Sequence, residues 1–499
     1  MKTRSLFDKT LLRGLLYSSS LRENPSRVNH ADCYSAVPMV KLRGGLSTVE
    51  YFTFGFGTMI GVGWLVLMDD WLSRGGPAGG ILGFLIGGLL LFPIAHTYGR
   101  LVQRIRDAGA EIAYTEGVFP PFTSYAAGWT MVLSYAIVCP WEAVATGNLL
   151  ARVFPSLNSY QMYVVGGSPI YAPRLVVGLA LTALIALVNY RGIKPSGIFQ
   201  DVMTFGLLAT FAIFTLLGFT RGSAANMEPL FSHPGTEGVW LSIFLVLQIV
   251  PYFMTGFESV TKGSEEARAG FDPRNFTKAI YAALVAGFLF YVIIIAVVTY
   301  VYPWQEIVSG HVRTEVAFER TFGSHAIAQL ILFGAFLSLL KIFNGNFVAA
   351  TRMLYAIGRR NLVHPSLGRV DERHGTPVVA ITLMALLTAA AAMFGDAILV
   401  PITEVGSLAV GVGWLSACAA YLARRRTAGG DGFRSESAGM AWAGCAVSAA
   451  IILMKVVPGV PGSFTRAEWV AFVGWSALGV VFWLARPRAK AEAVTHAGG

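Results

Sequence analysis

Long apolar runs, separated by short polar segments, make up most of this chain. An α-helix needs about 20 predominantly apolar residues to cross the hydrocarbon core of a bilayer. The pattern predicts twelve membrane-spanning helices, at about residues 47–72, 77–99, 122–151, 173–190, 196–219, 238–265, 277–302, 324–357, 376–395, 398–423, 438–458 and 467–485. The segments between them are too short to hold a soluble domain. The sequence therefore predicts an all-α integral membrane protein.

The composition supports this fold class. Of 499 residues, 55% are hydrophobic and only 13% are charged, and the mean hydropathy is +0.59. A soluble protein carries about 25% charged residues, so most of the surface of this one does not face water. The four cysteines, Cys33, Cys139, Cys418 and Cys445, form no CxxC pair and no Cys/His metal spacing. We therefore expect no disulfide framework, no metal site and no cofactor.

The basic residues indicate the orientation of the spans. If the N-terminus is cytoplasmic, 29 of the 38 Lys and Arg residues fall in cytoplasmic segments and 8 in outer loops. This bias follows the positive-inside rule and predicts that both termini are cytoplasmic. It also explains the net charge of +10 without a nucleic-acid partner. The first 44 residues are basic and polar and lack the continuous apolar stretch of a secretory signal.

The first span contains four glycines in nine residues, at positions 55, 57, 61 and 63. Glycine disfavours helix by about 1 kcal/mol relative to alanine. Unwound backbone at membrane depth is tolerated where it is buried in protein or lines a cavity. Close helix packing is the alternative, and it fits the second span better, where Gly79, Gly83 and Gly87 lie on one face. We therefore expect the first span to be broken.

The sixth span has a matching interruption, with Pro251, Gly256 and Glu258 near its middle. Breaks in the first and sixth spans divide ten spans into two sets of five with opposite orientation, which is typical of secondary transporters. The expected organisation is a cytoplasmic tail (1–45), a first five-helix repeat (46–220), a second, inverted repeat (238–425), two additional helices (438–486) and a cytoplasmic tail (487–499).

Two broken helices suit an α-amino acid. A half-helix beginning near Val62 presents free N–H groups to a carboxylate, and one ending near Met254 presents free carbonyls to an ammonium. The residues expected to bind substrate are Gly57, Thr58, Met59, Ile60, Gly61, Gly63, Phe253, Gly256, Phe257, Glu258 and Asn346.

Four motifs resemble those of the amino acid–polyamine–organocation (APC) family of permeases. They are Gly57–Gly63 (GTMIGVG), Asn189–Gly197 (NYRGIKPSG), Gly256–Ser259 followed by Glu265–Glu266 and Asp272–Arg274, and Thr351–Arg360 followed by Gly375–Pro377. The resemblance covers about residues 46–425. It implies a five-plus-five inverted-repeat (LeuT-like) fold with two extra helices, and alternating access to a central site. The run from Glu266 to Pro273 is longer than in the family pattern. After the eighth span the family motif ends in an acidic residue and a glycine, where this chain has Arg360-Asn361.

Three charged residues are expected within the membrane: Glu142, Glu258 and Lys341. A charge at mid-membrane costs about 2.5–3.5 kcal/mol on insertion scales, so each is a functional candidate. Three interpretations are open. Lys341 forms a structural ion pair with one of the carboxylates, one of the three residues carries a proton, or one of them contacts the substrate directly. The eighth span offers Lys341, Asn344 and Asn346 where a sodium site would need hydroxyls, so the pattern favours proton coupling over sodium.

A second charged group is predicted at the cytoplasmic mouth. Glu265 and Glu266 lie opposite Lys41 and Arg43 as a salt-bridged inner gate, or else form a solvated face.

The sequence gives little support to an enzyme, because no His-Glu and no Gly-Lys pair is present for a zinc-protease or phosphate-loop motif. We expect a secondary transporter of amino acids or related amines, with an exchanger as the alternative and a transporter-like sensor as a weaker one. The carboxylates favour a cationic substrate, and neutralisation by Lys341 would make a neutral one equally suitable. Short tails favour a multi-pass protein of a bacterial plasma membrane.

Overall fold

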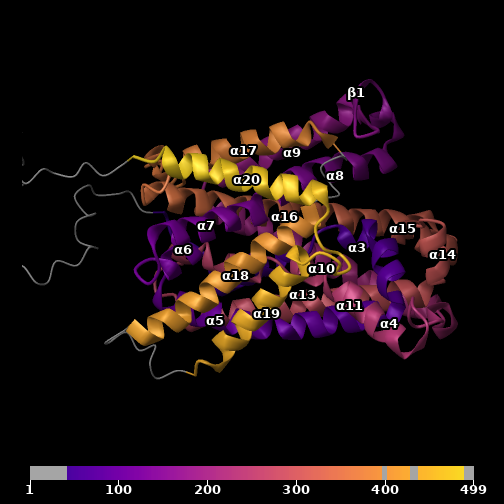
Figure 1. Ribbon diagram of the computed structural model, residues 1–499. Helices are drawn as coiled ribbons and strands as arrows, with labels where there is room; N and C mark the ends of the chain where they lie inside the picture. The colour runs from indigo at the N-terminus through magenta and orange to yellow at the C-terminus, as the bar shows by residue number, and fades with distance from the viewer. Residues whose placement is uncertain (1–41, 396–401, 428–436, 488–499) are drawn as a thin grey trace, which may run out of the picture. The chain divides into compact units, whose positions relative to one another are not determined.

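The computed structural model describes residues 42–395, 402–427 and 437–487. Its α-helices (Figure 1) are α2 (Thr48–Met59), α3 (Gly63–Val66), α4 (Met68–Leu90), α5 (Phe92–Arg104), α6 (Glu111–Thr115), α7 (Pro121–Ala136), α8 (Val138–Val153), α9 (Ala172–Tyr190), α10 (Ile193–Arg221), α11 (Gly235–Leu247), α12 (Val250–Phe253), α13 (Arg274–Val301), α14 (Trp304–Ser309), α15 (Thr314–Phe322), α16 (His325–Arg359), α17 (Val378–Ala392), α18 (Ile402–Thr427), α19 (Gly439–Val456) and α20 (Arg466–Leu484). Short 3-10 helices are η4 (Pro155–Asn158), η5 (Ala224–Met227), η6 (Phe257–Thr261), η7 (Ser264–Glu266) and η8 (Pro365–Gly368).

The predicted all-α membrane fold is confirmed. Within the described residues, eleven helical stretches are long and apolar enough to cross a membrane, and α17 is a shorter apolar helix. Every predicted span overlaps one of these helices, although residues 398–401 of the tenth lie outside the described part. α4 holds the end of the first predicted span and the start of the second. Gly76, at φ 65°, turns the chain between them.

Both predicted helix breaks are present. The first span stops being helical at Ile60–Val62, between α2 and α3. The sixth turns at Met254–Gly256, between α12 and η6. Gly256 has φ 138°, and a Cβ there would lie 2.8 Å from the backbone of Thr58 and Met59. The two breaks are therefore in direct contact, and only glycine allows this approach.

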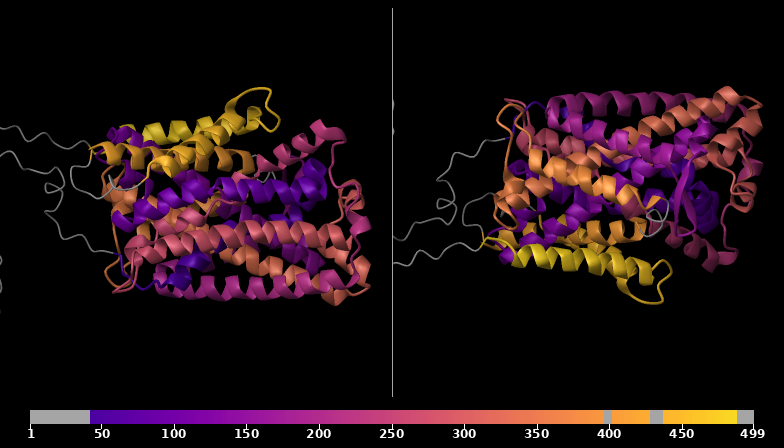
Figure 2. Two further views of the ribbon diagram at one scale, coloured as in Figure 1. Left: turned by 90° about the horizontal axis from the view of Figure 1, so that it is seen from below. Right: turned by 90° about the horizontal axis from the view of Figure 1, so that it is seen from above.

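α16 lies at the centre of the packing. All of its residues from Leu337 to Gly358 are buried, and it contacts α2, α7, α8, α10 and α15. α20 by contrast runs along the margin of the helices in both views of Figure 2, and only Glu468 and Gly479 of it are buried. A helix buried on all sides can place polar groups in the interior, and a marginal one cannot. α16 is thus placed to supply polar side chains to an internal site.

Some short elements were not predicted from the sequence. An antiparallel hairpin, β1 (Gln161–Val165) and β2 (Ser168–Tyr171), connects α8 to α9, with Val165 opposite Ser168. α14 and α15 connect α13 to α16, and α6 connects α5 to α7. In Figure 1, α6 lies at one end of the long helices and β1, α14 and α15 lie at the other. These ends are called the α6 end and the α14 end below.

Glycines in the second span allow it to pack closely on the sixth. A Cβ on Gly79, Gly83 or Gly87 would come within 3.1, 2.6 and 2.6 Å of Ser242, Val246 and Val250, respectively. These three contacts confirm the close-packing interpretation for this span. They hold α4 against the broken sixth span along one face.

We predict that Gly83→Val destabilises the protein by about 1–3 kcal/mol, because it over-packs this contact. The measurement is the thermal unfolding midpoint of detergent-solubilised protein. Gly474→Val on α20 is the matched control, since a Cβ at Gly474 meets nothing within 4 Å. Equal midpoints for the two variants would contradict the packing account.

Candidate functional site

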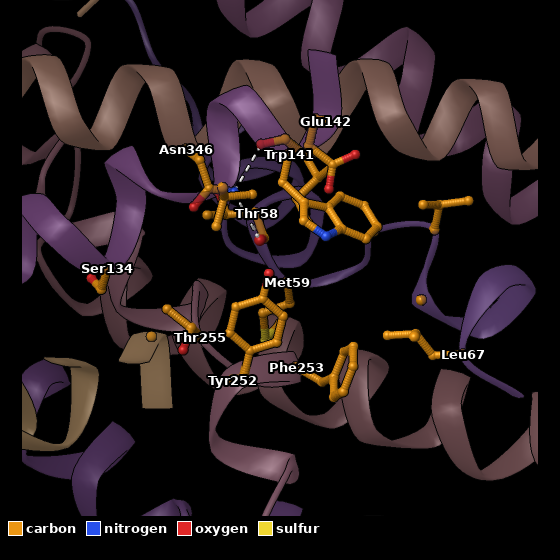
Figure 3. A pocket seen from close by; sticks show the side chains of 16 residues that line it. Thr58, Met59, Leu67, Ser134, Trp141, Glu142, Tyr252, Phe253, Thr255 and Asn346 are labelled. Atoms are coloured by element: carbon orange, nitrogen blue, oxygen red, sulfur yellow. Dashed lines mark hydrogen bonds between the residues drawn. The ribbon is translucent and has the colours of Figure 1, made fainter. Parts of the chain in front are cut away.

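A cavity lies where the breaks of the first and sixth spans meet (Figure 3). The space between the residues that line it is about 530 Å³, open solvent included. Its wall comes from both broken spans and from α7, α8, α16 and α18. The predicted site residues that line it are Thr58, Met59, Gly61, Gly63, Glu142, Phe253 and Asn346.

Side chains from neighbouring helices satisfy the carbonyls at the end of α2. Asn346 Nδ2 donates to Thr58 O at 3.3 Å, and Tyr291 Oη donates to Met59 O at 3.1 Å. Ser338 Oγ lies 2.9 Å from both Ile60 O and Gly61 O. An unbonded carbonyl in a low-dielectric interior is costly. These side chains therefore stabilise the break.

Lys341 completes this set. Its ammonium donates to Ile60 O and, at 3.4 Å, to Gly57 O, and it lies 5.3 Å from the centre of the Phe56 ring. Among the described residues no carboxylate comes within 4.0 Å of it, so the direct ion pair considered from the sequence is absent. Lys341 thus places its amino group as a donor at the carbonyl end of α2, where the helix dipole is negative.

The opposite side of the break carries free donors. Among the described residues, the N–H groups of Gly61, Val62 and Gly63 donate no hydrogen bond. Glu142 lies beside them, because a Cβ at Gly61 would be 3.3 Å from Glu142 Oε1. Glu142 Oε2 is buried and has no partner in the described structure. In Figure 3 the Glu142 carboxyl lies next to the Trp141 indole at the edge of the cavity.

The sixth span contributes acceptors and apolar surface. The carbonyls of Phe253 and Met254 accept no hydrogen bond from any described residue. Tyr252 and Phe253 line the cavity, and the Tyr252 hydroxyl points into it (Figure 3). A Cβ at Gly406 of α18 would lie 2.8 Å from the Tyr252 ring, so this glycine makes room for the tyrosine.

Several predicted binding residues lie outside the cavity wall. Phe257 packs on Trp414, with ring centres 5.4 Å apart. Glu258 accepts from Tyr135 Oη at 2.9 Å and from the N–H of Gly256 at 3.0 Å. It lies beyond the break, in the first turn of η6, where a carboxylate bonds the free N–H groups of the turn. In this structure Glu258 therefore does not line the cavity.

Gly57, Ile60 and Gly256 act through the backbone and also do not line the cavity. A Cβ on Gly57 would clash with the Gln200 amide at 1.9 Å. Ile60 serves through its carbonyl, as described above. Lining residues that the sequence did not single out are Leu67, Ser134, Val138, Tyr252, Thr255, Ile342 and Gly406. Tyr252 adjoins Pro251 of the predicted break, and that position was the one available signal for it.

The predicted inner-gate acids are paired, but with residues of α16. Glu266 accepts two bonds from Arg352, at 2.8 and 3.1 Å, and both side chains are fully buried. Glu265 pairs with Arg359 and also accepts from the N–H of Ala108 at 2.8 Å. These bonds join the end of the sixth span to α16 and to the loop before α6.

The predicted basic partners are not found there. Arg43 is exposed and donates to the carbonyl of Glu372 at 3.1 Å, and Lys41 lies outside the described residues. In this structure the segment before α2 contacts Glu266 through its backbone and not through Arg43. The N–H groups of Gly45 and Leu46 donate to Glu266 O at 2.8 and 3.0 Å.

Asp107, in the loop before α6, extends the same network. It pairs with Arg359 and Arg360 at 2.6 and 2.7 Å. Burial alone raises the pKa of the Asp107 carboxyl, but Arg360, Arg359 and hydrogen bonds outweigh it, so the pKa lies below its ordinary value. The carboxylate is charged at neutral pH, and its contribution to stability is lost only when the pH falls through this lowered pKa.

Known proteins are similar over most of the chain. Residues 51–486 match the amino acid permease family. The amino-acid permease RocE of Bacillus subtilis (strain 168) is 24% identical over 399 residues, which are 77% of this chain and 82% of the relative. A methylthioribose transporter of that organism is 25% identical (76% and 80% covered), and its branched-chain amino acid permease BcaP is 24% identical (75% and 79%). The chain belongs to the amino acid permease family, whose members are membrane transporters and not enzymes.

Proposed function

We propose that the protein is a secondary transporter of amino acids that works by alternating access. The observation that carries the proposal is the meeting of two broken spans at one cavity, with free N–H groups at Gly61–Gly63 and free carbonyls at Phe253 and Met254. An α-amino acid has a carboxylate and an ammonium on one carbon. These groups complement the two sets of backbone dipoles.

The two breaks occupy the first and sixth spans, which supports two inverted five-helix repeats over residues 46–220 and 238–425, followed by two additional helices. The distribution of Lys and Arg supports cytoplasmic termini. In this orientation the α6 end is cytoplasmic, and the protein is a multi-pass protein of the plasma membrane, as in a bacterial inner membrane. The ion pairs of Glu265 and Glu266 with α16 then close the cavity towards the cytoplasm.

We further propose that the substrate is a neutral amino acid with an apolar side chain. Glu142 is the one acidic residue among those lining the described cavity. Leu67, Val138, Trp141 and Phe253 form the wall available to the side chain. The names of the relatives include branched-chain amino acids and methylthioribose, so they do not select a substrate. The cavity wall supports a neutral substrate, because an apolar wall leaves a cationic side chain without compensation.

The position of Glu142 supports proton coupling. A substrate carboxylate bound at Gly61 would lie against Glu142 Oε1. Two like charges at 4 Å repel by about 4 kcal/mol at an effective dielectric constant of 20. Substrate therefore binds well only when Glu142 is protonated, so the substrate and the proton enter together. Lys341 remains at the α2 carbonyls, in the position that a coupling cation would need.

The direct test is uptake of radiolabelled leucine, isoleucine, methionine, phenylalanine and arginine into proteoliposomes without sodium. Under an inward proton gradient we predict accumulation of at least one of the four apolar substrates, lost on adding an uncoupler, and little accumulation of arginine. Accumulation of arginine alone would refute the neutral-substrate assignment. Sodium-dependent accumulation would refute proton coupling, and exchange without accumulation would make the protein an antiporter.

A second prediction concerns Lys341. Lys341→Met removes the ammonium that bonds Gly57 O and Ile60 O and faces the Glu142 charge across the site. We predict that pH-driven uptake is abolished, because neither the break nor Glu142 keeps its electrostatic partner. The measurement is initial uptake rate against external pH.

Lys278→Met on the exposed side of α13 is the control for this variant and should retain the wild-type pH profile. Unaltered uptake at every pH in the Lys341→Met variant would remove Lys341 from the mechanism.

A further inference from the structure

A second pocket lies between α8, α9 and α17, beside the β1–β2 hairpin. Most of its lining is apolar and comes from Ala143, Val144, Pro169, Ile170, Leu175 and Ala392. The one charged residue in the lining is Arg174, in the first turn of α9. This pocket shares no residue with the cavity at the two breaks. We call it the Arg174 pocket, and the transport site does not explain it.

Arg174 has only neutral partners. Its Nε donates to Asn158 Oδ1 at 2.7 Å and its Nη1 to Asn148 Oδ1 at 3.1 Å, and Nη2 also donates to Asn158 Oδ1. The guanidinium lies 4.8 Å from the centre of the Tyr171 ring. A guanidinium has five N–H groups. Three of them are used in these bonds, so two remain for a further acceptor.

The positive charge at this place is not compensated. Among the described residues no carboxylate lies within 4.0 Å of Arg174. The sequence from Ala143 to Gln200 contains no Asp or Glu, and neither does α17. The dipole of α9 adds to the charge, because its positive end is the helix N-terminus where Arg174 lies. The wall of the pocket therefore attracts an anion.

The position of the pocket indicates what kind of anion fits. Arg174 is the third residue of a membrane-spanning helix, so it lies near the level of the lipid head groups. Further along, α9 contacts α17 (Figure 1), and both helices have apolar outer surfaces. The side chains between 43% and 63% exposed there are Val176, Leu184, Leu187, Leu386 and Leu387. An anionic group at Arg174 is thus followed by a surface suited to acyl chains.

We propose that the Arg174 pocket binds an anionic phospholipid. The lipid phosphate accepts hydrogen bonds from the remaining N–H groups of Arg174, and arginine suits phosphate oxygens because its donors form a planar fork. The first part of one acyl chain fills the apolar pocket, and the rest runs along α9 and α17. A soluble anion gains nothing from the apolar wall. A zwitterionic lipid brings a cationic group for which the pocket has no carboxylate.

A purely structural role for Arg174 makes a different prediction. Its hydrogen bonds join Asn148 of α8 to Asn158 of η4. If that were its whole role, removing the guanidinium would lower the stability of the protein equally with and without added lipid. If Arg174 binds a lipid phosphate, the loss of stability depends on the presence of an anionic head group.

The test is thermal unfolding of the detergent-solubilised full-length protein, titrated with phosphatidylglycerol or with phosphatidylcholine of the same acyl chains. A ligand that binds only the folded state raises the unfolding midpoint. We expect phosphatidylglycerol to raise the wild-type midpoint to a plateau, and phosphatidylcholine and inorganic phosphate to leave it unchanged. In Arg174→Gln the apparent affinity for phosphatidylglycerol should fall about tenfold or more, because charge-assisted hydrogen bonds are lost.

Arg221→Gln is the matched control. Arg221 ends α10, is exposed and lies over Phe322 of α15, so it is also at the α14 end, but it lines neither pocket. This variant should keep the wild-type response.

Val144→Phe fills the pocket from α8 and keeps the guanidinium, so it should lose the response to phosphatidylglycerol even if Arg174→Gln does not fold. The inference is overturned if Arg174→Gln or Val144→Phe responds to phosphatidylglycerol as the wild type does, or if both lipids act equally on the wild type. A response to inorganic phosphate equal to that to phosphatidylglycerol would also overturn it, since the site would then bind soluble anions.

Discussion

The structure depends on one constraint: a backbone polar group inside a membrane must have a partner. The break after α2 frees five successive carbonyls, from Gly57 to Gly61, and each accepts a bond from a side chain of α13 or α16. The N–H groups on the other side of the break, at Gly61–Gly63, have no such partners. The protein therefore satisfies one end of the break with its own side chains, and the other end is the one we propose for the substrate carboxylate.

This asymmetry assigns separate roles to the two broken spans. Because Lys341, Ser338, Asn346 and Tyr291 already occupy the α2 carbonyls, a substrate ammonium has to find its acceptors on the sixth span. The sixth span is also the one tied to the α6 end, through Glu265, Glu266 and the Lys262–Glu111 ion pair. In the proposed mechanism, substrate binding and closure of the α6 end thus act on the same element.

α16 connects the two regions mechanically. Lys341 and Arg352 are eleven residues apart on this buried helix, which is about 16 Å at 1.5 Å per residue. The first holds the break, and the second holds Glu266. A movement of α16 relative to the sixth span would therefore affect the site and the gate together. The two fully buried ion pairs at the α6 end, Arg352–Glu266 and Lys262–Glu111, are costly to keep dry, so hydration on opening offsets part of the cost of separating them.

Much of the fold follows from the sequence, because membrane spans and glycine-rich breaks are local signals. The placement of the breaks at Ile60–Val62 and Met254–Gly256 is of this kind. The side-chain partners cannot be predicted in this way, because they come from other helices. Glu258 is near the break in sequence, but the 3-10 turn after Gly256 directs it to Tyr135 and away from the cavity. Arg43 was predicted at the gate from charge alone, whereas Arg352 and Arg359 reach the acids because α16 continues as one helix to Arg359. Ser338 is a single hydroxyl in an apolar run, with no local signal to mark it.

The central claim is that the substrate carboxylate and a proton bind at one place, Gly61 and Glu142. Calorimetric titration of the detergent-solubilised wild type with the transported amino acid tests it most directly. Titrations in two buffers of different ionisation enthalpy give the number of protons taken up on binding. The account predicts about one proton per substrate at a pH where Glu142 is ionised in the empty site, and none in a Glu142→Gln variant that still binds. Binding by the wild type without proton uptake at any pH would contradict it.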